Sequence, residues 1–543
     1  MPIFRIKDGC IEGIDCRGGV SIAEKDLRVF SQTLVISGTT CPVPAVRFTS
    51  FSNPFAMTDS SRSDRRHWIK TAAGLSAAVT LAELCPLGRV LADQGVTLQA
   101  DPSLDLFRVR VELEIEGNIN ITPSAAVTAT KEKGKGEEKE KPKAMQVPVE
   151  STAVLDCEER ILASATDGTA QVADRFYHEA KSTGTVGNKP LELTLRPDSR
   201  KVRVQHQESQ WVAYSNDVYL DGRELELLKV PASSLAVDAL LPKDEVQSGT
   251  KYTIDSPVLA KWLALASVEQ STVQGEVLSS ADQEVKLQLA GTVEGSVAGV
   301  PTTIELAAKL TFDRVARCCT WVAVGMKEVR QIGKSEPGFE VAATIRMVRK
   351  PMESPVRLGN EPATDWKETP PAERLLTELA STALGYSVLM DRRWKIINDV
   401  AGSGMIRLID NDSVIAQVNI HPLGRLAAGE QLTLEAFVTE SRKSLGNRFG
   451  EVLKSTEELN GAGLRVLRVT IQGSVDSVPI QWVFMQFSDD SGRRLLATMT
   501  ISNDYVANYA GGDEQLSSSL RFLALNDQTM GVAKQPGDAA EKR

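Results

Sequence analysis

The feature that most constrains the fold is a series of segments in which apolar and polar residues alternate one by one. The first is Leu106–Ile115, with the sequence LFRVRVELEI. Because successive side chains of a strand point to opposite faces of a sheet, this alternation predicts a strand with one buried and one wet face. Similar segments recur at 201–204, 285–297, 303–313, 320–324 and 339–347. We therefore expect residues 93–349 to form a β-rich body, a curved antiparallel sheet with short turns.

The middle of this body has a different pattern, which predicts short helices. Mixed periodicity replaces alternation at residues 174–181, 222–228, 233–241 and 257–265. Helices at these positions would cover one face of the sheet and complete its core. The run Lys131–Lys143 mixes lysine with glutamate and is nearly neutral, so residues 131–143 are expected to be a disordered charged insert.

A second domain is expected after a proline-rich stretch. Residues 350–372 have several prolines and no periodic pattern, which is typical of a linker. Beyond them, strands are predicted at 405–409, 414–420, 464–472, 478–487 and 494–501, and helices at 432–445 and 514–523. We expect a smaller α/β domain over residues 373–525 and a disordered tail over 526–543. The predicted fold class is therefore α+β.

The residues of this second domain resemble a known family. The resemblance is carried by a succession of short motifs: Tyr386-Ser387-Val388, Ile415–Ile420, Gly461–Val466, Val478–Phe484 and Gly492–Leu495. Together they are similar to the PsbP-like fold, which an extrinsic photosystem protein shares with a nuclear-import factor that binds a small GTPase. The resemblance implies an α/β/α arrangement and mostly non-enzymatic binding or assembly roles. It transfers no functional residue, because the fold has no shared catalytic set.

Residues 57–92 have the three parts of an export signal. A basic stretch precedes an apolar, alanine-rich run, and small residues near Ala92 predict cleavage between Ala92 and Asp93. The basic stretch resembles a twin-arginine signal at five positions, namely Arg65, Arg66, Trp68, Ile69 and Lys70. That resemblance implies export in the folded state and a periplasmic or secreted protein. An ordinary secretory signal that carries two arginines remains the alternative.

Residues 1–56 lie upstream of this signal and show no sustained periodicity. We expect translation to start at Met57, which would make residues 1–56 a wrongly assigned extension. The alternative is a cytoplasmic extension, which would place the signal in mid-chain.

Composition argues against several classes of partner. A formal charge of −9 gives no basic field for a phosphate backbone, so we expect no nucleic-acid partner. No later segment approaches the roughly 20 apolar residues of a transmembrane helix, so we expect no transmembrane anchor in the mature chain. The adjacent Cys318 and Cys319 are expected to be one packed and one exposed residue, and a bridge from Cys157 to either remains open.

The sequence offers no recognisable catalytic, cofactor or metal site. The histidines of the predicted mature chain, His178, His206 and His421, form no local cluster with metal-ligand spacing. The dense polar groups Cys157–Arg160 and Asp174–Glu179 are interpreted as ion pairs on exposed faces. The glycine-rich run Gly291–Gly299 is interpreted as tight sheet packing.

Two hypotheses of function follow from this pattern. The first is an exported, non-catalytic envelope protein whose concave sheet face binds a small apolar ligand or whose surface docks a partner protein. A filled interface between the sheet and its covering helices would favour the partner. The second is a periplasmic hydrolase with dispersed active-site residues. A structure that groups His178 or His206 with carboxylates in one cleft would favour it, and histidines that are far apart and exposed would rule it out.

Overall fold

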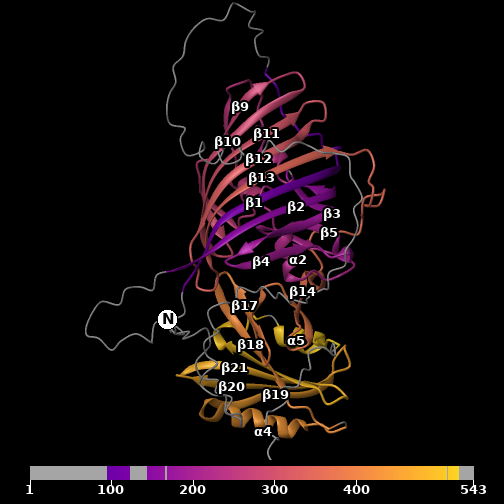
Figure 1. Cartoon of the computed structure of the whole chain (residues 1–543), viewed down its shortest axis with the longest axis vertical. Coiled ribbons are helices and arrows are strands. Elements are labelled where there is room, and N and C mark those ends of the chain that lie inside the picture. Colours follow the sequence, from indigo (N-terminus) through magenta and orange to yellow (C-terminus); the bar gives the residue numbers. More distant parts are fainter. Residues whose placement is uncertain (1–94, 123–143, 166–167, 428, 510, 525–543) are drawn as a thin grey trace, which may run out of the picture. The chain divides into compact units, whose positions relative to one another are not determined.

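The computed structural model describes residues 95–122, 144–165, 168–427, 429–509 and 511–524. Over these residues the chain is β-rich and contains two large antiparallel sheets (Figure 1). The β-rich antiparallel part of the predicted fold class is thereby confirmed. The extension 1–56, the signal 57–92, the insert 131–143 and the tail 526–543 lie outside the described residues, as do the export and cleavage residues.

The body forms one open sheet. Its strands in chain order are β1 (Leu106–Ile121), β2 (Met145–Ser164), β3 (Ala170–Val186), β4 (Lys189–Thr194), β5 (Lys201–Gln207), β6 (Gln210–Tyr214), β7 (Lys251–Thr253), β8 (Ser267–Ser271), β9 (Gln274–Ser280), β10 (Glu284–Val297), β11 (Val300–Asp313), β12 (Cys318–Arg330) and β13 (Gly338–Pro351). Their order across the sheet is β6-β5-β3-β2-β1-β13-β12-β11-β10-β9-β7, with β4 paired to β3 and β8 to β10. β1 and β13, far apart in sequence, lie side by side in the middle (Figure 1).

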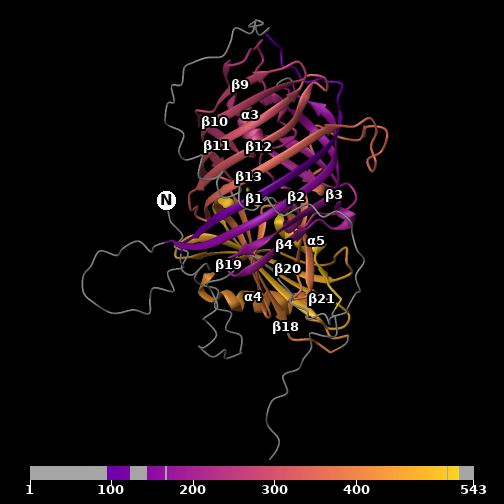
Figure 2. The ribbon, with the colours of Figure 1, turned by 45° about the horizontal axis from the view of Figure 1, so that its top comes forward.

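The segment between β6 and β8 covers one face of this sheet. It contains α2 (Gly222–Leu228), the 3₁₀ turn η4 (Asp238–Leu240) and α3 (Ser256–Leu263). Val258, Leu259 and Trp262 of α3 belong to the same buried cluster as the inward side chains of the strands, and Figure 2 shows α3 within the curve of the sheet. The helices predicted at 222–228 and 257–265 are confirmed.

Two of the predicted helices are wrong. Residues 174–181 lie in strand β3, where pairing with β2, β4 and β5 outweighs their mixed local periodicity. Residues 233–241 form a hydrogen-bonded turn followed by the 3₁₀ turn η4, and no α-helix. Another 3₁₀ turn, η3, spans Pro197–Ser199 ahead of β5.

Glycines let strand β8 and its connection to β9 approach strand β10 closely. Gly291, at φ +150°, is where β10 changes its partner from β9 to β8, and an added Cβ would lie 2.6 Å from the Cα of Val273. At Gly295 an added Cβ would lie 2.1 Å from the carbonyl oxygen of Ser267. The glycine-rich run therefore serves sheet packing, as the alternating sequence around it predicts.

The C-terminal region contains a larger and a smaller antiparallel sheet. Its strands are β14 (Leu376–Ser381), β15 (Tyr386–Asp391), β16 (Trp394–Val400), β17 (Ser403–Asp410), β18 (Ser413–Leu423), β19 (Phe449–Leu459), β20 (Arg465–Val475), β21 (Val478–Ser488), β22 (Arg494–Ser502) and β23 (Arg521–Phe522). The larger sheet has the order β16-β17-β18-β22-β21-β20-β19, and a smaller one the order β14-β15-β23. The 3₁₀ turns are η5 (Ala372–Leu375), η6 (Gly446–Arg448) and η7 (Asn503–Tyr505).

One core lies on each face of the larger sheet. Helix α4 (Leu434–Leu445) contributes Phe437 and Leu445 to a cluster with Leu467 and Trp482. Helix α5 (Gly512–Ser519) contributes Leu516 to the other cluster, together with strands β14 and β15. Both helices were predicted, although the one predicted at 514–523 ends at Ser519, and so were β17, β18, β20, β21 and β22; β14, β15, β16, β19 and β23 were not. No helix among the described residues is long and apolar enough to cross a membrane.

Candidate functional site

The three histidines occupy separate environments. His178 Nε2 lies 2.7 Å from Glu158 Oε1. His206 packs edge-on against Trp211, and His421 Nδ1 lies 3.2 Å from the carbonyl oxygen of Gly402. The β3–β5 register pairs Gln205 with Val172, six residues from His178 along β3, so His178 and His206 are about 20 Å apart. Within the described ranges, no group of three or more His, Cys, Asp or Glu side chains has metal-binding geometry.

The three described cysteines are free and buried. Strands β1 and β13 separate β2 from β12, so Cys157 lies about 14 Å from Cys318 and Cys319, well beyond the roughly 7 Å reach of a disulfide. The prediction that one of the two adjacent cysteines is exposed is wrong, since Cys318 and Cys319 are each 1% exposed. A register shift opposite Thr311 and Phe312 interrupts the alternation of β12 at this point.

Two consecutive glutamates on β2 lie at the centre of a cluster of polar contacts in the body. Glu158 and Glu159 are both 0% exposed, although they point to opposite faces of the sheet. The prediction that Cys157–Arg160 and Asp174–Glu179 form exposed ion pairs is therefore wrong for the β2–β3 pair. The reason is that other segments of the chain cover both faces of these strands.

On the outer face, Glu158 binds the backbone of the segment that follows β13. Its Oε2 accepts hydrogen bonds from the backbone N–H groups of Val356, Arg357 and Leu358 at 3.0, 2.9 and 3.0 Å. The guanidinium carbon of Arg357 lies 4.8 Å from the centroid of the Phe176 ring. We call residues 352–371 the strap, because this segment has no regular secondary structure and lies along the outer face.

The strap is held at further points along β2, β3 and β5. Arg160 donates to the carbonyl oxygen of Gly359. Arg203, itself paired with Asp174 at 2.7 Å, donates to Asp365 at 3.0 Å. Gln205 Nε2 donates to the carbonyl oxygens of Lys367 and Glu368 at 2.9 and 2.5 Å. The segment expected as a linker is thus fixed to the body by buried polar side chains.

On the inner face, Glu159 ties the sheet to its covering segment. Its Oε2 accepts from Arg175 Nη2 and Ser234 Oγ, both at 2.7 Å. Arg175 Nη1 also donates to the hydroxyl of Tyr177 at 3.2 Å. Because Ser234 belongs to the segment between α2 and η4, this contact joins the middle of the sheet to the layer that covers it.

A second buried ion pair makes the same kind of connection. Arg349 of β13 pairs with Asp238 of η4, and its guanidinium carbon lies 3.5 Å from the centroid of the Phe107 ring. Asp238 also accepts the backbone N–H of Cys319 at 2.8 Å. Polar contacts therefore fix the covering segment at two places on the concave face.

The two faces have opposite effects on titratable groups. Burial opposes charge on Glu158, but hydrogen bonds from the backbone of Arg357 and Leu358 and the contact with His178 outweigh it and lower the pKa of Glu158. On the inner face, burial raises the pKa of Cys157 and that of Tyr177 to about 12 each. The thiol of Cys157 and the phenol of Tyr177 are therefore neutral at physiological pH. Neither is activated as a nucleophile.

The His178–Glu158 pair belongs to the polar contacts that hold the strap. Glu158 accepts backbone N–H groups through both of its oxygens, besides its contact with His178, so it is committed to holding the strap. The pair has the geometry of a structural contact.

The concave face is filled, and an apolar pair is exposed on the outer face. Trp262, Leu259 and Val277 are 0% exposed between the sheet and its covering segment. On the outer side, Trp321 and Val348 are register partners on β12 and β13, and they are 38% and 51% exposed. Exposed tryptophan is favoured at protein interfaces, so this pair is the best candidate contact surface.

Together these features define a β-rich protein built on open antiparallel sheets. No family model and no curated protein matches the chain. Among solved structures, a protein from Bacteroides thetaiotaomicron VPI-5482 is similar at 12% identity and a TM-score of 0.20, over 27% of this chain and 48% of that one. Lipovitellin, in a structure titled for lipid–protein interactions, is similar at 9% identity and a TM-score of 0.26, over 47% of this chain and 26% of that one.

A third likeness is to the translocator domain of the autotransporter NalP from Neisseria meningitidis. It has 6% identity and a TM-score of 0.11, over 73% of this chain and 86% of that one. The chain thus spans about half of the Bacteroides protein and about a quarter of lipovitellin. At these TM-scores the likenesses carry no argument about function.

Proposed function

We propose that the chain is an exported, non-catalytic binding protein of the bacterial cell envelope, and that it docks a partner protein. The observation that carries this choice is the filled concave face. An apolar ligand would need space between the sheet and its covering segment, where Leu259, Trp262 and Val277 are fully buried. The exposed pair Trp321 and Val348 offers a contact surface on the opposite side of the sheet.

Export is part of the proposal and rests on the signal-like residues 57–92. Arg65 and Arg66 would route the chain through the twin-arginine pathway, with cleavage after Ala92 and a periplasmic or secreted product. A conservative Arg65→Lys, Arg66→Lys variant tests the route, because an ordinary secretory signal needs only positive charge. Loss of the variant from the envelope fraction supports twin-arginine export, and unchanged export contradicts it.

The C-terminal region would support assembly. Its motifs resemble the PsbP-like fold, and the members of that family mostly bind or assemble other proteins. We therefore propose a PsbP-like docking role for residues 373–525. An experimental structure whose strand order differs from that family would contradict this part.

Native mass spectrometry on protein recovered from the envelope fraction of its host tests the central proposal. A complex with a second protein supports partner docking, whereas extra mass of lipid size would replace it with carriage of an apolar ligand. A photo-crosslinking residue at position 321 then locates the interface, with one at the exposed Glu269 as control. Crosslinking at 321 alone is expected.

Trp321→Ala provides a quantitative test. Because the side chain is partly exposed, its removal should change the free energy of unfolding by no more than about 1 kcal/mol. Partner affinity should fall at least tenfold if Trp321 is an interface anchor, since such residues contribute about 2 kcal/mol or more. Unchanged affinity would move the interface elsewhere.

A further inference from the structure

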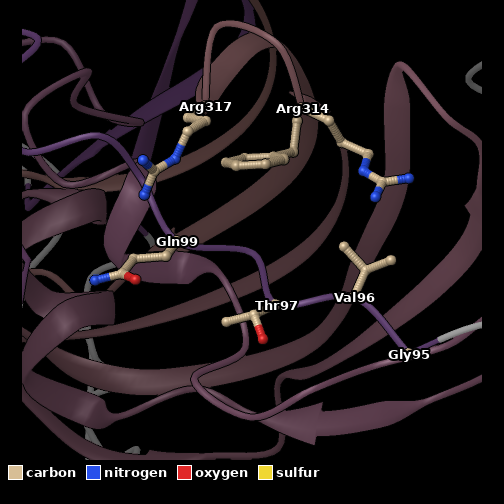
Figure 3. Close-up of a pocket in the computed structure, with 7 residues that line it drawn as sticks. Gly95, Val96, Thr97, Gln99, Arg314 and Arg317 are labelled. Atoms are coloured by element: carbon tan, nitrogen blue, oxygen red, sulfur yellow. The ribbon is translucent and has the colours of Figure 1, made fainter.

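A cavity of about 400 Å³ lies at the end of the body where β11 turns into β12. One wall is the segment Gly95–Gln99, and the other comes from Phe312, Arg314 and Arg317. Figure 3 shows the guanidinium groups of the two arginines pointing to opposite sides. Arg317 is paired with Asp101 at 3.8 Å, so the cavity presents no concentrated charge to a ligand.

Strand β19, in contrast, is an open edge of the larger C-terminal sheet. Among the described residues its only neighbouring strand is β20, so the N–H and C=O groups on its outer side have no partner strand there. Eight of its 11 residues are exposed, whereas β16 at the opposite edge exposes only two of its seven. Leu453 and Leu459 are 48% and 75% exposed. An edge of this kind is a template for pairing with another strand.

Edge strands are usually protected from such pairing by bulges, but β19 is irregular in only one half. Register shifts interrupt its pairing with β20 twice, both before Lys454. From Lys454 to Leu459 the pairing is regular, and this half contains no proline. Its charged side chains have both signs. They can therefore attract or repel a second strand, depending on the register.

The regular half of β19 is complementary to itself in one antiparallel register. When Thr456 lies opposite Thr456 of a second copy, Lys454 of each chain lies opposite Glu458 of the other. The same register brings Leu453 opposite Leu459. Because side chains alternate along a strand, Lys454, Thr456 and Glu458 share one face, where two ion pairs would flank the threonine pair. Both Lys454 and Glu458 are exposed, and neither has an ion-pair partner in the described part of the chain.

The neighbouring registers lack this complementarity. A two-fold axis through a continuous antiparallel sheet places one residue opposite its own copy, so the registers differ in which residue is central. With Ser455 at the centre, Leu453 faces the charge of Glu457 and Lys454 faces no carboxylate. With Glu457 or Lys454 at the centre, a charge lies opposite its own copy, which destabilises the pair. Charge therefore favours the register centred on Thr456.

We propose that β19 pairs antiparallel with β19 of a second copy of this chain, so that the two larger C-terminal sheets become one continuous sheet across a two-fold axis. The backbone groups of the edge supply the hydrogen bonds, and the paired charges of Lys454 and Glu458 select the register. Because the pairing covers only residues 453–459 of each chain, the dimer is expected to dissociate on dilution. Trp321 and Val348 lie on the body, so partner docking does not depend on this dimer.

Sedimentation velocity of the full-length chain over a range of concentrations tests the proposal. Lys454→Glu places carboxylates opposite each other, and Glu458→Lys places ammonium groups opposite each other, so each variant should dimerise about tenfold more weakly. The double variant Lys454→Glu, Glu458→Lys restores both pairs with the signs exchanged and should dimerise like the unmodified chain. The matched control is Glu451→Lys, an exposed position on the same strand outside the paired half, which should have no effect.

A crosslink locates the two-fold axis. In the Thr456→Cys variant the introduced thiols of two copies lie opposite each other, and mild oxidation should give a covalent dimer joined at position 456, as identified by mass spectrometry of the peptides. Thr439→Cys, at an exposed position on α4, is the control and should stay monomeric.

Two kinds of result overturn the proposal. One is a chain that stays monomeric at every concentration and forms no covalent dimer through position 456. The other is a dimer that the single charge reversals leave intact, or that the double reversal fails to restore. Because Lys454 and Glu458 are exposed, the melting temperature of the monomer should be the same in all variants, which separates loss of pairing from loss of folding.

Discussion

The two faces of the β2–β3 pair use neighbouring residues for different purposes. Glu158 on the outer face holds a segment nearly 200 residues away through its backbone, whereas Glu159 on the inner face pairs with the side chain of Arg175. Backbone N–H dipoles stabilise the carboxylate of Glu158, whereas the positive charge of Arg175 neutralises the carboxylate of Glu159. Removal of the Glu159 carboxylate therefore leaves the charge of Arg175 buried without its partner. Removal of the Glu158 carboxylate instead releases the strap.

Glu159→Ala should have the largest effect. It leaves Arg175 in the core without a counter-charge, which costs about 3–5 kcal/mol of unfolding free energy. Urea unfolding measures the loss, and Glu150→Ala, an exposed position on the same strand, is the control and should cost about 0.5 kcal/mol or less. A loss below about 1 kcal/mol would show that the inner pair is not buried as described.

Glu158→Ala should cost less, about 2–3 kcal/mol, because the strap can move away and let water reach the freed N–H groups. Limited proteolysis should then cut within residues 352–371, where the unmodified chain resists. Rapid cutting of the strap in the unmodified chain would show that it is a free linker.

The outer face should also respond to acid. Since the folded-state pKa of Glu158 lies below its unfolded value, its stabilising contribution is complete above the unfolded pKa, about 4.3, and is lost as the pH falls through the folded pKa. Pepsin cleavage of the strap should accelerate over that interval. Glu158→Gln, whose side chain does not titrate, should show a flatter pH dependence.

At the far end of the strap, Gln205→Ala should have a smaller effect. It removes two hydrogen bonds to backbone carbonyls, at Lys367 and Glu368, and should cost about 1 kcal/mol. Proteolysis should then begin near residues 365–368 and spare Val356–Leu358. Cutting at both ends together would mean that the strap is released as one unit.

The smallest expected effect is on the reactivity of the Cys157 thiol, two residues before Glu159 on β2. With its pKa raised to about 12, Cys157 is almost entirely protonated at pH 8. It should resist alkylation in the folded protein and react fully in guanidinium chloride, as judged by mass spectrometry of its peptide. Fast labelling in the folded state would show that water reaches the inner face.

Much of the fold could be predicted from local pattern. Alternation located β1, β10, β11, β12 and β13, and the mixed pattern at 222–228 and 257–265 located α2 and α3. It failed at 174–181, where β3 carries polar residues on both faces because both faces make specific contacts. It also missed β19, an edge strand with the sequence FGEVLKSTEEL that is largely exposed and so lacks a buried face to produce alternation.

The candidate sites were much harder to predict. Trp321 and Val348 appear in alternating strands, but their pairing on one exposed face depends on the β12–β13 register. The cavity at Arg314 and Arg317 requires a turn and the segment Gly95–Gln99, which are separated by more than 200 residues. Neither the sequence of the turn nor that of Gly95–Gln99 indicates that the two segments lie together.

By itself, the sequence determined that the segments with regular alternation, such as β1 and β10–β13, form strands with one apolar side, because alternation with a period of two is a property of a single extended segment. Only the tertiary structure decided that the polar sides of β2 and β3 are buried as well. The carboxylate of Glu158 is covered by Val356–Leu358, and that of Glu159 by the layer containing Ser234. Burial of a charge depends on which distant segment covers it, and local periodicity carries no information about that choice.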